Sequence, residues 1–306
     1  MLFPPCRHSS LLCRMNIAVV LLLAGTMTMP GCARNNHAVT LAHLRKQGYI
    51  TVGFADEAPY AYRSSATGRL TGESPVTLRI VMKRLGVQHI RGVLVPFGSL
   101  IPGLQAHRFD IIAAGMFITP ARARVILFTN PTFAVGEGFI VKAGNPMNLH
   151  SYSSVAHNPK ARLGVVTGSQ EYRYAVECGI PVSRIVEFPD APDAVDGVAT
   201  GRVDAYGGTA LTVQRIVGQL QKSGKHNLVE AKPFYDPLIH GHIVRGYGAF
   251  GLRKDESALC AAINRELSVV LSSKSYQHKM RQFGFTSAQS PGRLTAKKVC
   301  QLQESP

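Results

Sequence analysis

The chain has 306 residues, of which 45% are hydrophobic, and its formal net charge is +16. This length allows one large domain or two smaller domains with separate cores. Beyond the N-terminal region no stretch is apolar enough to span a membrane. The Lys and Arg residues are scattered without a nucleic-acid-binding motif, so we expect no nucleic-acid partner. We attribute the positive charge to solubility and to attraction to an anionic lipid surface.

Residues 1–31 have the pattern of a secretory signal. Arg7 and Arg14 supply positive charge, and a short apolar run from Ile17 to Met29 follows. Gly31-Cys32 resembles the end of a bacterial lipobox, in which the cysteine is lipidated and becomes the new N-terminus. Met29-Pro30 matches that pattern poorly, so an ordinary cleaved signal is the alternative to lipidation at Cys32. Both predict a periplasmic protein or one anchored on the extracytoplasmic side of the membrane.

Cysteine usage gives little information about chemistry. Cys178, Cys260 and Cys300 follow the signal, and their spacing matches no metal site. We expect neither a metal nor another cofactor. Cys260 and Cys300 could form a disulfide in an oxidising compartment, which would leave one thiol unpaired.

The first part of the mature chain alternates strand and helix patterns. The predicted elements, in chain order, are strand 49–54, helix 75–85, strand 92–95, helix 100–106 and strand 110–114. This βαβαβ order predicts a mostly parallel sheet that is covered by helices.

A second α/β unit begins at residue 163. Its predicted elements are strand 163–166, helix 169–178, strand 185–188, helix 191–200 capped by Asp190, strand 203–206 and helix 209–222, and strand 247–252 and helices 256–271 and 275–283 follow. Turn-rich links at 142–162 and 232–246 flank this unit. We predict an α/β fold of two lobes joined by a double hinge, with 38–142 and 246–306 in lobe 1 and 143–245 in lobe 2. The ligand would lie in the cleft, outside the carboxyl ends of the strands.

Polar and aromatic residues follow the first two strands of lobe 1. Glu57 and Tyr60 come directly after strand 49–54, where they could pair with a ligand cation and offer it the face of a ring. A solvated turn, with Tyr60 covering the core, explains these two residues equally well. Phe97 follows the second strand, and its position favours the cleft wall over the core.

The segment after the third strand has the features of a carboxylate site. Gly115 permits close approach of the backbone to a ligand, and Met116 and Phe117 follow it. Thr119 begins a helix with outward-pointing backbone N–H groups, and Arg122 lies in the first turn, where a cation opposes the helix dipole. This placement is explained if Arg122 and the N–H groups jointly hold an anion, for which a carboxylate is the natural candidate.

A second set of donors is predicted in lobe 2. The segment Thr167-Gly168-Ser169-Gln170 follows a strand and opens a helix. We expect Gly168 and Ser169 to face the lobe 1 site across the cleft.

Four segments carry a resemblance to a known family. They are Val52-Gly-Phe-Ala-Asp-Glu-Ala-Pro-Tyr60, Phe97-Gly-Ser-Leu-Ile-Pro-Gly103, Phe109-Asp-Ile-Ile-Ala-Ala-Gly-Met-Phe-Ile-Thr-Pro120 and Arg245-Gly-Tyr-Gly-Ala-Phe250. In this order they resemble the ectoine/hydroxyectoine-binding proteins of ABC importers, which belong to the wider class that binds polar amino acids. The resemblance covers residues 45 to 285. It implies a type II periplasmic-binding-protein fold, a monomeric solute-binding subunit rather than an enzyme, and docking on an ABC permease in the inner membrane.

The resemblance also implies roles for individual residues. Arg122 would bind the ectoine carboxylate, and Glu57 would bond to a ring nitrogen. The side chains of Phe117, Tyr60 and Phe97 would surround the ring, whose positive charge is delocalised. The remaining predicted ligand-binding residues are Gly115, Met116, Thr119, Gly168, Ser169 and Thr209.

Thr209 bears on the choice of ligand. Amino-acid binders of this class usually carry an aspartate after the strand Gly-Arg-Val-Asp-Ala, where it holds the α-ammonium group. Thr209 stands at that position, which favours a ligand without a primary ammonium. The segments Ser74-Pro75-Val76, Gln170-Glu171-Tyr172-Arg173 and Gly207-Gly208 depart from the family pattern, so an ordinary amino acid stays the alternative ligand.

Two other classes of function remain open. A periplasmic dehydratase of the cyclohexadienyl type would need a general acid or base in the cleft, for which Glu57 is the clear carboxylate candidate. A sensory or interaction module would instead pass its ligand-bound state to a receptor.

Overall fold

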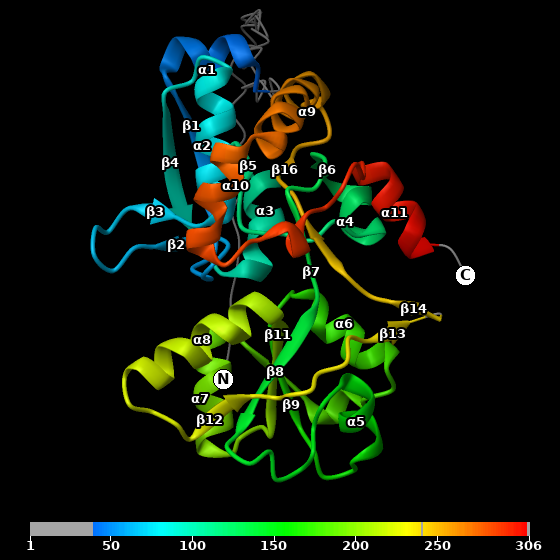
Figure 1. The fold of residues 1–306 in the computed structure, drawn as a ribbon. Coiled ribbons are helices and arrows are strands. Elements are labelled where there is room, and N and C mark those ends of the chain that lie inside the picture. Colours follow the sequence, from blue (N-terminus) through cyan, green and yellow to red (C-terminus); the bar gives the residue numbers. More distant parts are fainter. Residues whose placement is uncertain (1–38, 240, 305–306) are drawn as a thin grey trace, which may run out of the picture. The chain divides into compact units, whose positions relative to one another are not determined.

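The computed structural model describes residues 39–239 and 241–304, in which two β-sheets are each flanked by helices (Figure 1). The predicted signal segment 1–31 and the lipidation candidate Cys32 lie outside these residues. Within the described residues, no helix has the length and apolar character needed to cross a membrane.

The first sheet has the strand order β4-β1-β5-β16-β6. β1 (Tyr49–Phe54) is parallel to β4 (His89–Leu94) and to β5 (Ile111–Ile112). β16 (Gly251–Leu252) is antiparallel to β5 and to β6 (Leu127–Phe128). The predicted parallel arrangement therefore holds for β1, β4 and β5. The antiparallel strand β16, which follows the second sheet in the chain, makes the first sheet mixed.

Helices cover both faces of this sheet. They are α1 (Leu41–Gln47), α2 (Glu73–Arg84), α3 (Leu100–Gln105), α4 (Pro120–Val125), α9 (Ser257–Ser272), α10 (Lys274–Met280) and α11 (Ala296–Glu304), with short 3-10 turns η1 (Phe97–Ser99), η3 (Arg281–Phe283) and η4 (Ser287–Gln289). A hairpin of β2 (Tyr62–Arg63) and β3 (Leu70–Thr71) projects between β1 and α2. The apolar faces of β1, α2 and α9 form one buried cluster, which is the main core of the first half.

The second sheet has the order β10-β9-β11-β8-β12. β9 (Leu163–Val166) is parallel to β10 (Ile185–Phe188) and β11 (Ala205–Thr209), whereas β8 (Glu137–Lys142) is antiparallel to β11 and β12 (Leu228–Glu230). The surrounding helices are α5 (Tyr152–His157), α6 (Gln170–Glu177), α7 (Ala191–Thr200) and α8 (Ala210–Lys222), with the short turn η2 (Val182–Arg184). Two buried clusters, one on each face of the sheet, form the core of this half.

The chain passes between the two halves along paired strands. β7 (Phe133–Val135) is antiparallel to β15 (Gly246–Gly248), and a small hairpin of β13 (Leu238–Ile239) and β14 (His242–Ile243) precedes the return (Figure 1). The chain first crosses to the second half before Glu137, whereas the sequence predicts this boundary after residue 142. The crossing is placed there because β8 is buried and pairs with β11 in the second sheet.

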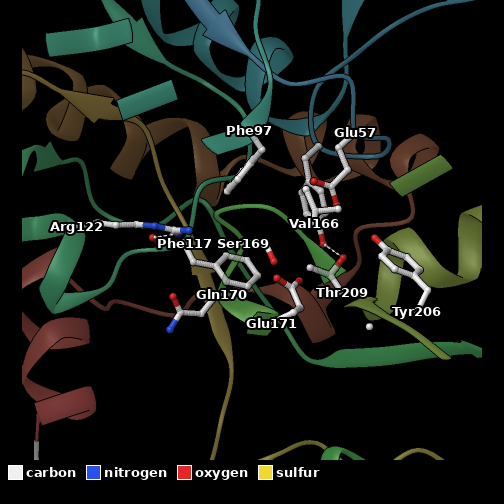
Figure 2. Close-up of a pocket in the computed structure, with 13 residues that line it drawn as sticks. Glu57, Phe97, Phe117, Arg122, Val166, Ser169, Gln170, Glu171, Tyr206 and Thr209 are labelled. Atoms are coloured by element: carbon white, nitrogen blue, oxygen red, sulfur yellow. Dashed lines mark hydrogen bonds between the residues drawn. The ribbon is translucent and has the colours of Figure 1, made fainter. Parts of the chain in front are cut away.

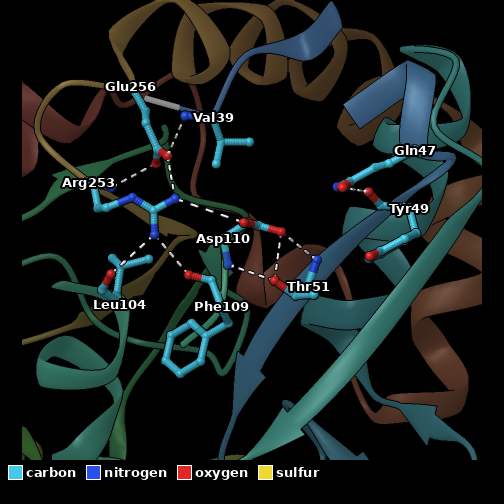
Figure 3. A network of polar contacts seen from close by, with 9 residues as sticks. All are labelled: Val39, Gln47, Tyr49, Thr51, Leu104, Phe109, Asp110, Arg253 and Glu256. Atoms are coloured by element: carbon cyan, nitrogen blue, oxygen red, sulfur yellow. Dashed lines mark hydrogen bonds and ion pairs between the residues drawn. The ribbon is translucent and has the colours of Figure 1, made fainter. Parts of the chain in front are cut away.

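A buried arginine joins distant parts of the first half. Nη1 of Arg253 donates to the backbone carbonyl oxygens of Leu104 at 3.1 Å and Phe109 at 2.9 Å. Its Nη2 pairs with Glu256, which also accepts a hydrogen bond from the backbone N–H of Val39 (Figure 3). These contacts hold α3, the segment before β5 and the start of α9 together.

The cysteines do not form the disulfide that the sequence left open. Cys178, Cys260 and Cys300 are all free thiols. Cys260 is buried in α9, where its Sγ donates to the backbone carbonyl of Phe128 at 3.4 Å, whereas Cys300 lies on α11.

Candidate ligand-binding site

Side chains from both halves line one pocket at the carboxyl ends of β1, β5, β9 and β11 (Figure 2). The lining comprises Glu57, Tyr60, Phe97, Gly115, Phe117, Arg122, Val166, Ser169, Gln170, Glu171, Tyr206, Gly207 and Thr209. The structure thus brings together all the predicted site residues except Met116, Thr119 and Gly168.

Those three residues lie beside the lining rather than in it. Met116 is buried in an apolar cluster of the first half. Thr119 is the N-cap of α4, and its hydroxyl accepts a hydrogen bond from the backbone N–H of Arg122 at 3.2 Å. Gly168 offers its backbone carbonyl to Arg122. Met116 therefore contributes to packing, and Thr119 positions the helix turn that carries Arg122.

The sequence interpretation missed Val166, Gln170, Glu171, Tyr206 and Gly207. Val166 ends β9, and Gln170 and Glu171 form the first turn of α6. Tyr206 and Gly207 belong to β11. The rule that residues at the carboxyl ends of parallel strands face the cleft selects Val166, but it does not reach Glu171, which lies in a helix turn.

Gly115 brings the backbone against the ring of Tyr60. Its φ is +68°, and an added Cβ would come within 2.7 Å of the Tyr60 ring. The Gly115 N–H donates to Oγ of Ser74 at 3.1 Å, and that hydroxyl donates to buried Glu73 at 2.7 Å. Glycine is therefore required here by both the backbone conformation and the space available.

Aromatic side chains support the pocket wall from behind. The ring of Tyr60 stacks on Phe133 with centroids 4.9 Å apart, and it meets Phe285 edge-on at 5.8 Å. Phe133 in turn contacts Phe117 edge-on at 6.4 Å. Such offset and edge-on contacts fix ring orientation, so Tyr60 and Phe117 present defined faces to the pocket.

Arg122 links the two halves. Its Nη1 donates to the backbone carbonyl of Phe117 and its Nη2 to that of Gly168, each at 2.9 Å. The guanidinium carbon lies 5.6 Å from the ring centroid of Phe97. Burial lowers the pKa of Arg122, and the negative charge of Glu171 opposes this shift. The guanidinium therefore remains a cation with two N–H donors directed at oxygen atoms.

A series of hydrogen-bonded hydroxyl groups runs from the first half to the second and back to the first, and we call it the hydroxyl chain. Tyr60 Oη donates to Thr209 Oγ1 at 2.7 Å, which donates to Thr212 Oγ1 at 3.1 Å. Thr212 Oγ1 donates to Glu57 Oε1 at 3.0 Å. Thr209 and Thr212 lie at the start of α8 in the second half, so the chain connects two residues of the first half through the second.

Two carboxyl groups line the pocket. Burial, with a contribution from the negative charge of Glu171, raises the pKa of Glu57 to about 7, and the hydrogen bond from Thr212 opposes this. Burial also raises the pKa of Glu171, against hydrogen bonding at the start of α6 and the charge of Arg122. A cation in the pocket would favour the ionised form of both groups.

A third buried carboxyl group, Glu137, lies beside the lining. It faces Thr209 in the β8–β11 pairing, and its Oε2 accepts a hydrogen bond from Tyr152 Oη at 3.3 Å. Its Oε1 has no hydrogen-bond partner among the described residues, and burial raises its pKa well above the usual range. Across residues 39–239 and 241–304, no group of three or more His, Cys, Asp or Glu side chains could hold a metal ion.

The two halves are closed over this pocket. The cavity volume is about 30 Å³, only two to three times the roughly 10–15 Å³ that a single water molecule requires. Gly98 and Gly168 meet backbone to backbone, since a Cβ on Gly168 would lie 2.8 Å from Gly98 Cα. A larger ligand can enter only if the halves move apart and the contacts of Arg122 and the hydroxyl chain open.

Comparison with known proteins identifies the family to which this site belongs. Residues 50–286 match the model of the bacterial extracellular solute-binding proteins, family 3. A probable amino-acid ABC transporter periplasmic-binding protein of Sinorhizobium fredii is 37% identical over 250 residues, which are 81% of this chain and 81% of that protein.

Two solved structures are similar over most of the chain. EhuB in complex with hydroxyectoine is 30% identical with a TM-score of 0.76, covering 85% of this chain and 97% of that one. An ancestral amino acid-binding protein, a precursor of cyclohexadienyl dehydratase, is 22% identical with a TM-score of 0.67, covering 80% of this chain and 99% of that one. The second likeness shows the fold alone, and both structures support the predicted two-lobed type II binding-protein fold.

Proposed function

Since the chain belongs to the bacterial extracellular solute-binding proteins, family 3, we propose that it is the extracytoplasmic binding subunit of an ABC importer for a small zwitterion of the ectoine and hydroxyectoine type. It would capture the ligand by closure of its two halves and deliver it to a membrane permease.

The arrangement of charge around the aromatic wall carries this proposal. Figure 2 shows Arg122 and Glu57 on different sides of the pocket, with Phe97 and Phe117 between them. A carboxylate on the ligand could take the two N–H donors that Arg122 now directs at the carbonyls of Phe117 and Gly168. A delocalised ring cation could then donate to Glu57 and lie against the aromatic faces.

The position of Thr209 supports a ligand without a primary ammonium group. Thr209 lies in the pocket, and its hydroxyl accepts the hydrogen bond of Tyr60. A hydroxyl group provides no charge to hold an ammonium ion. A ring cation that spreads its charge over two N–H groups would instead be matched by Glu57 and Glu171.

Glu171 also favours the second candidate, a polar amino acid. This carboxyl group lines the pocket from α6, and a ligand ammonium ion could reach it instead of the position of Thr209. The chain's similarity to a probable amino-acid transporter subunit supports this alternative.

Isothermal titration calorimetry with ectoine, hydroxyectoine, arginine, histidine and glutamate tests the proposal. We expect ectoine or hydroxyectoine to bind most tightly, and Arg122→Ala to weaken that binding by about 100-fold, because a buried charge pair loses one partner. Arg124→Ala, on the exposed side of the same helix, should leave it unchanged. Clear binding of an amino acid without any binding of ectoines would refute the ectoine assignment and leave the transport role.

The enzymatic alternative has a separate test. Glu57, with a pKa raised to about 7, could exchange a proton with a bound substrate at neutral pH. Turnover of prephenate or arogenate that is lost in Glu57→Gln would establish a dehydratase. We expect no turnover, because the 37% identical relative is a probable transport binding protein.

A further inference from the structure

The fold gathers basic side chains that are scattered along the sequence. Two hollows of about 470 and 560 Å³ adjoin each other, because both are lined by Arg69, Leu70 and Arg79. We call the two together the basic groove. Its basic residues come from the β2–β3 hairpin, α2, β4 and α8, and they are Arg63, Arg69, Arg79, Lys83, His89 and Arg215. No Asp or Glu of the described part of the chain lines it.

The described residues do not neutralise the charges of the basic groove. Among the described residues, none of these basic side chains lies in an ion pair. Nη2 of Arg79 donates to the carbonyl of Leu70 at 3.1 Å, and Nη2 of Arg215 donates to Tyr62 Oη at 3.2 Å. Nε of Arg215 is buried without a hydrogen-bond partner in the described part of the chain. Neighbouring like charges repel, so a bound anion would stabilise this surface.

The groove also borders a strand with a free edge. Among the strands of residues 39–239 and 241–304, β4 pairs with β1 alone and is the edge strand of the first sheet. His89, Ile90 and Gly92 of β4 line the groove. The outward N–H and C=O groups of such an edge can pair with an extended peptide, whereas a lipid headgroup or a free phosphate cannot use them in this way.

We propose that the basic groove binds an extended acidic peptide segment of a protein partner. The peptide backbone pairs with the edge of β4, and its carboxylates contact Arg69 and Arg79. Arg215 comes from α8 in the second half and stacks on Tyr62 of the first, 4.9 Å from the ring centroid. The groove is therefore complete only while the two halves are closed, so that the partner would bind the closed form more tightly.

Fluorescence anisotropy with a labelled octaglutamate peptide tests the proposal on the full protein. We expect saturable binding that weakens as salt is added, because the contacts are between exposed charges. The double variant Arg69→Ala/Arg79→Ala should weaken it about fivefold or more. Arg69→Ala alone, whose side chain has no partner in the described residues, gives a smaller loss and guards against misfolding of the double variant.

Three controls separate electrostatic attraction from the proposed site. Lys297→Ala/Lys298→Ala removes two exposed charges from α11, and it should leave peptide binding unchanged. A peptide of eight N-methylated glutamate residues has no internal backbone N–H group to donate to the β4 edge, and it should bind several-fold more weakly than octaglutamate. Binding of the protein to vesicles of phosphatidylglycerol should not depend on Arg69 and Arg79.

The outcomes that overturn the proposal follow from these controls. Equal losses in the α11 control would mean general attraction to net charge. Equal binding of octaglutamate and its N-methylated form would exclude edge pairing. Vesicle binding that depends on Arg69 and Arg79, without peptide binding, would assign the groove to lipid. Self-association of the arginine variants, with no peptide binding by the parent protein, would mean that the charges only protect the β4 edge.

Discussion

Arg122 donates to two backbone carbonyl groups, although the sequence predicts a carboxylate as its partner. The two observations are compatible, because the guanidinium presents the same N–H groups to any oxygen acceptor. In the closed pocket the carbonyls of Phe117 and Gly168 occupy the positions that ligand oxygens could take. A single side chain thus serves both closure of the two halves and the proposed recognition of the ligand. No sequence pattern distinguishes these two roles.

The raised pKa of Glu57 predicts pH-dependent ligand binding. A cationic ligand binds the ionised carboxylate, and half of the Glu57 groups are protonated at about pH 7. Affinity should rise as the pH increases through 7, and fall below it by up to about tenfold per pH unit. Calorimetry at pH 5.5, 6.5 and 8 measures this. Glu57→Gln should strongly reduce the dependence and leave only the contribution of Glu171, whereas Asp56→Asn should preserve it. Affinity that falls with rising pH would contradict the prediction.

The same carboxyl group affects stability with a defined sign. Its pKa is higher in the folded protein than the usual value of 4.5, so the unfolded chain ionises first and stability declines as pH rises from about 4.5 to 7. Glu57→Gln removes this penalty. We expect a gain in unfolding free energy of about 1–2 kcal/mol at pH 8, reduced because Glu57 is partly exposed, and none at pH 4. Urea denaturation at both pH values checks the difference.

Gly115→Ala should destabilise the protein and weaken ligand binding. The added methyl group would meet the Tyr60 ring at 2.7 Å in a backbone conformation that alanine disfavours. We expect a loss of about 2–4 kcal/mol in unfolding free energy. Gly144→Ala is a matched control, since Gly144 has φ of +77° with nothing within 4 Å of its Cβ position. A loss there as large as at Gly115 would assign the effect to backbone conformation alone.

Individual elements differ in how far the sequence predicts them. Helix α7 and strands β9 and β10 have the predicted bounds, because Asp190 caps α7, Gly201 ends it and both strands are short apolar runs. Strands β6, β7 and β8 were not predicted. Each pairs with a strand distant in the sequence, so its identity depends on contacts that local patterns do not contain.

Part of the site can be predicted from the order of the strands alone. Tyr60, Phe97 and Arg122 follow strands whose carboxyl ends meet at one edge, and that rule places them without a structure. Glu171 was missed because it occupies a helix turn in the second half. Its proximity to Arg122 and Glu57 depends on how far the two halves close.

Closure depends on the contact between η1 and the turn before α6. A Cβ on Gly98 would lie 3.4 Å from the carbonyl oxygen of Thr167, an ordinary contact distance. Gly98→Ala should therefore be tolerated, whereas the longer side chain in Gly98→Leu should hold the halves apart. We expect about tenfold weaker ligand binding with unchanged thermal stability. Calorimetry and small-angle scattering check this, and unchanged affinity in the leucine variant would contradict it.

At the scale of the whole molecule, each half has its own core, and the first depends on Arg253. Arg253→Met leaves buried Glu256 without its cationic partner, so we expect a loss of about 3–5 kcal/mol in unfolding free energy. Arg173→Met removes an exposed ion pair with Glu177 and should cost less than about 1 kcal/mol. Equal effects in denaturant titrations would show that the Arg253 network does not support the first half.

The hydroxyl chain has a direction, because each hydroxyl group has one proton to donate. From Tyr60 through Thr209 and Thr212, every donor points toward Glu57, the terminal acceptor. If Glu57 takes up a proton, its O–H group can donate a hydrogen bond to Thr212 and each bond of the chain can reverse in turn. Tyr60 then accepts from Thr209, and its own O–H group must turn to another acceptor. One protonation event on one side of the cleft is then transmitted as a reversal of polarity to the ring that faces the ligand.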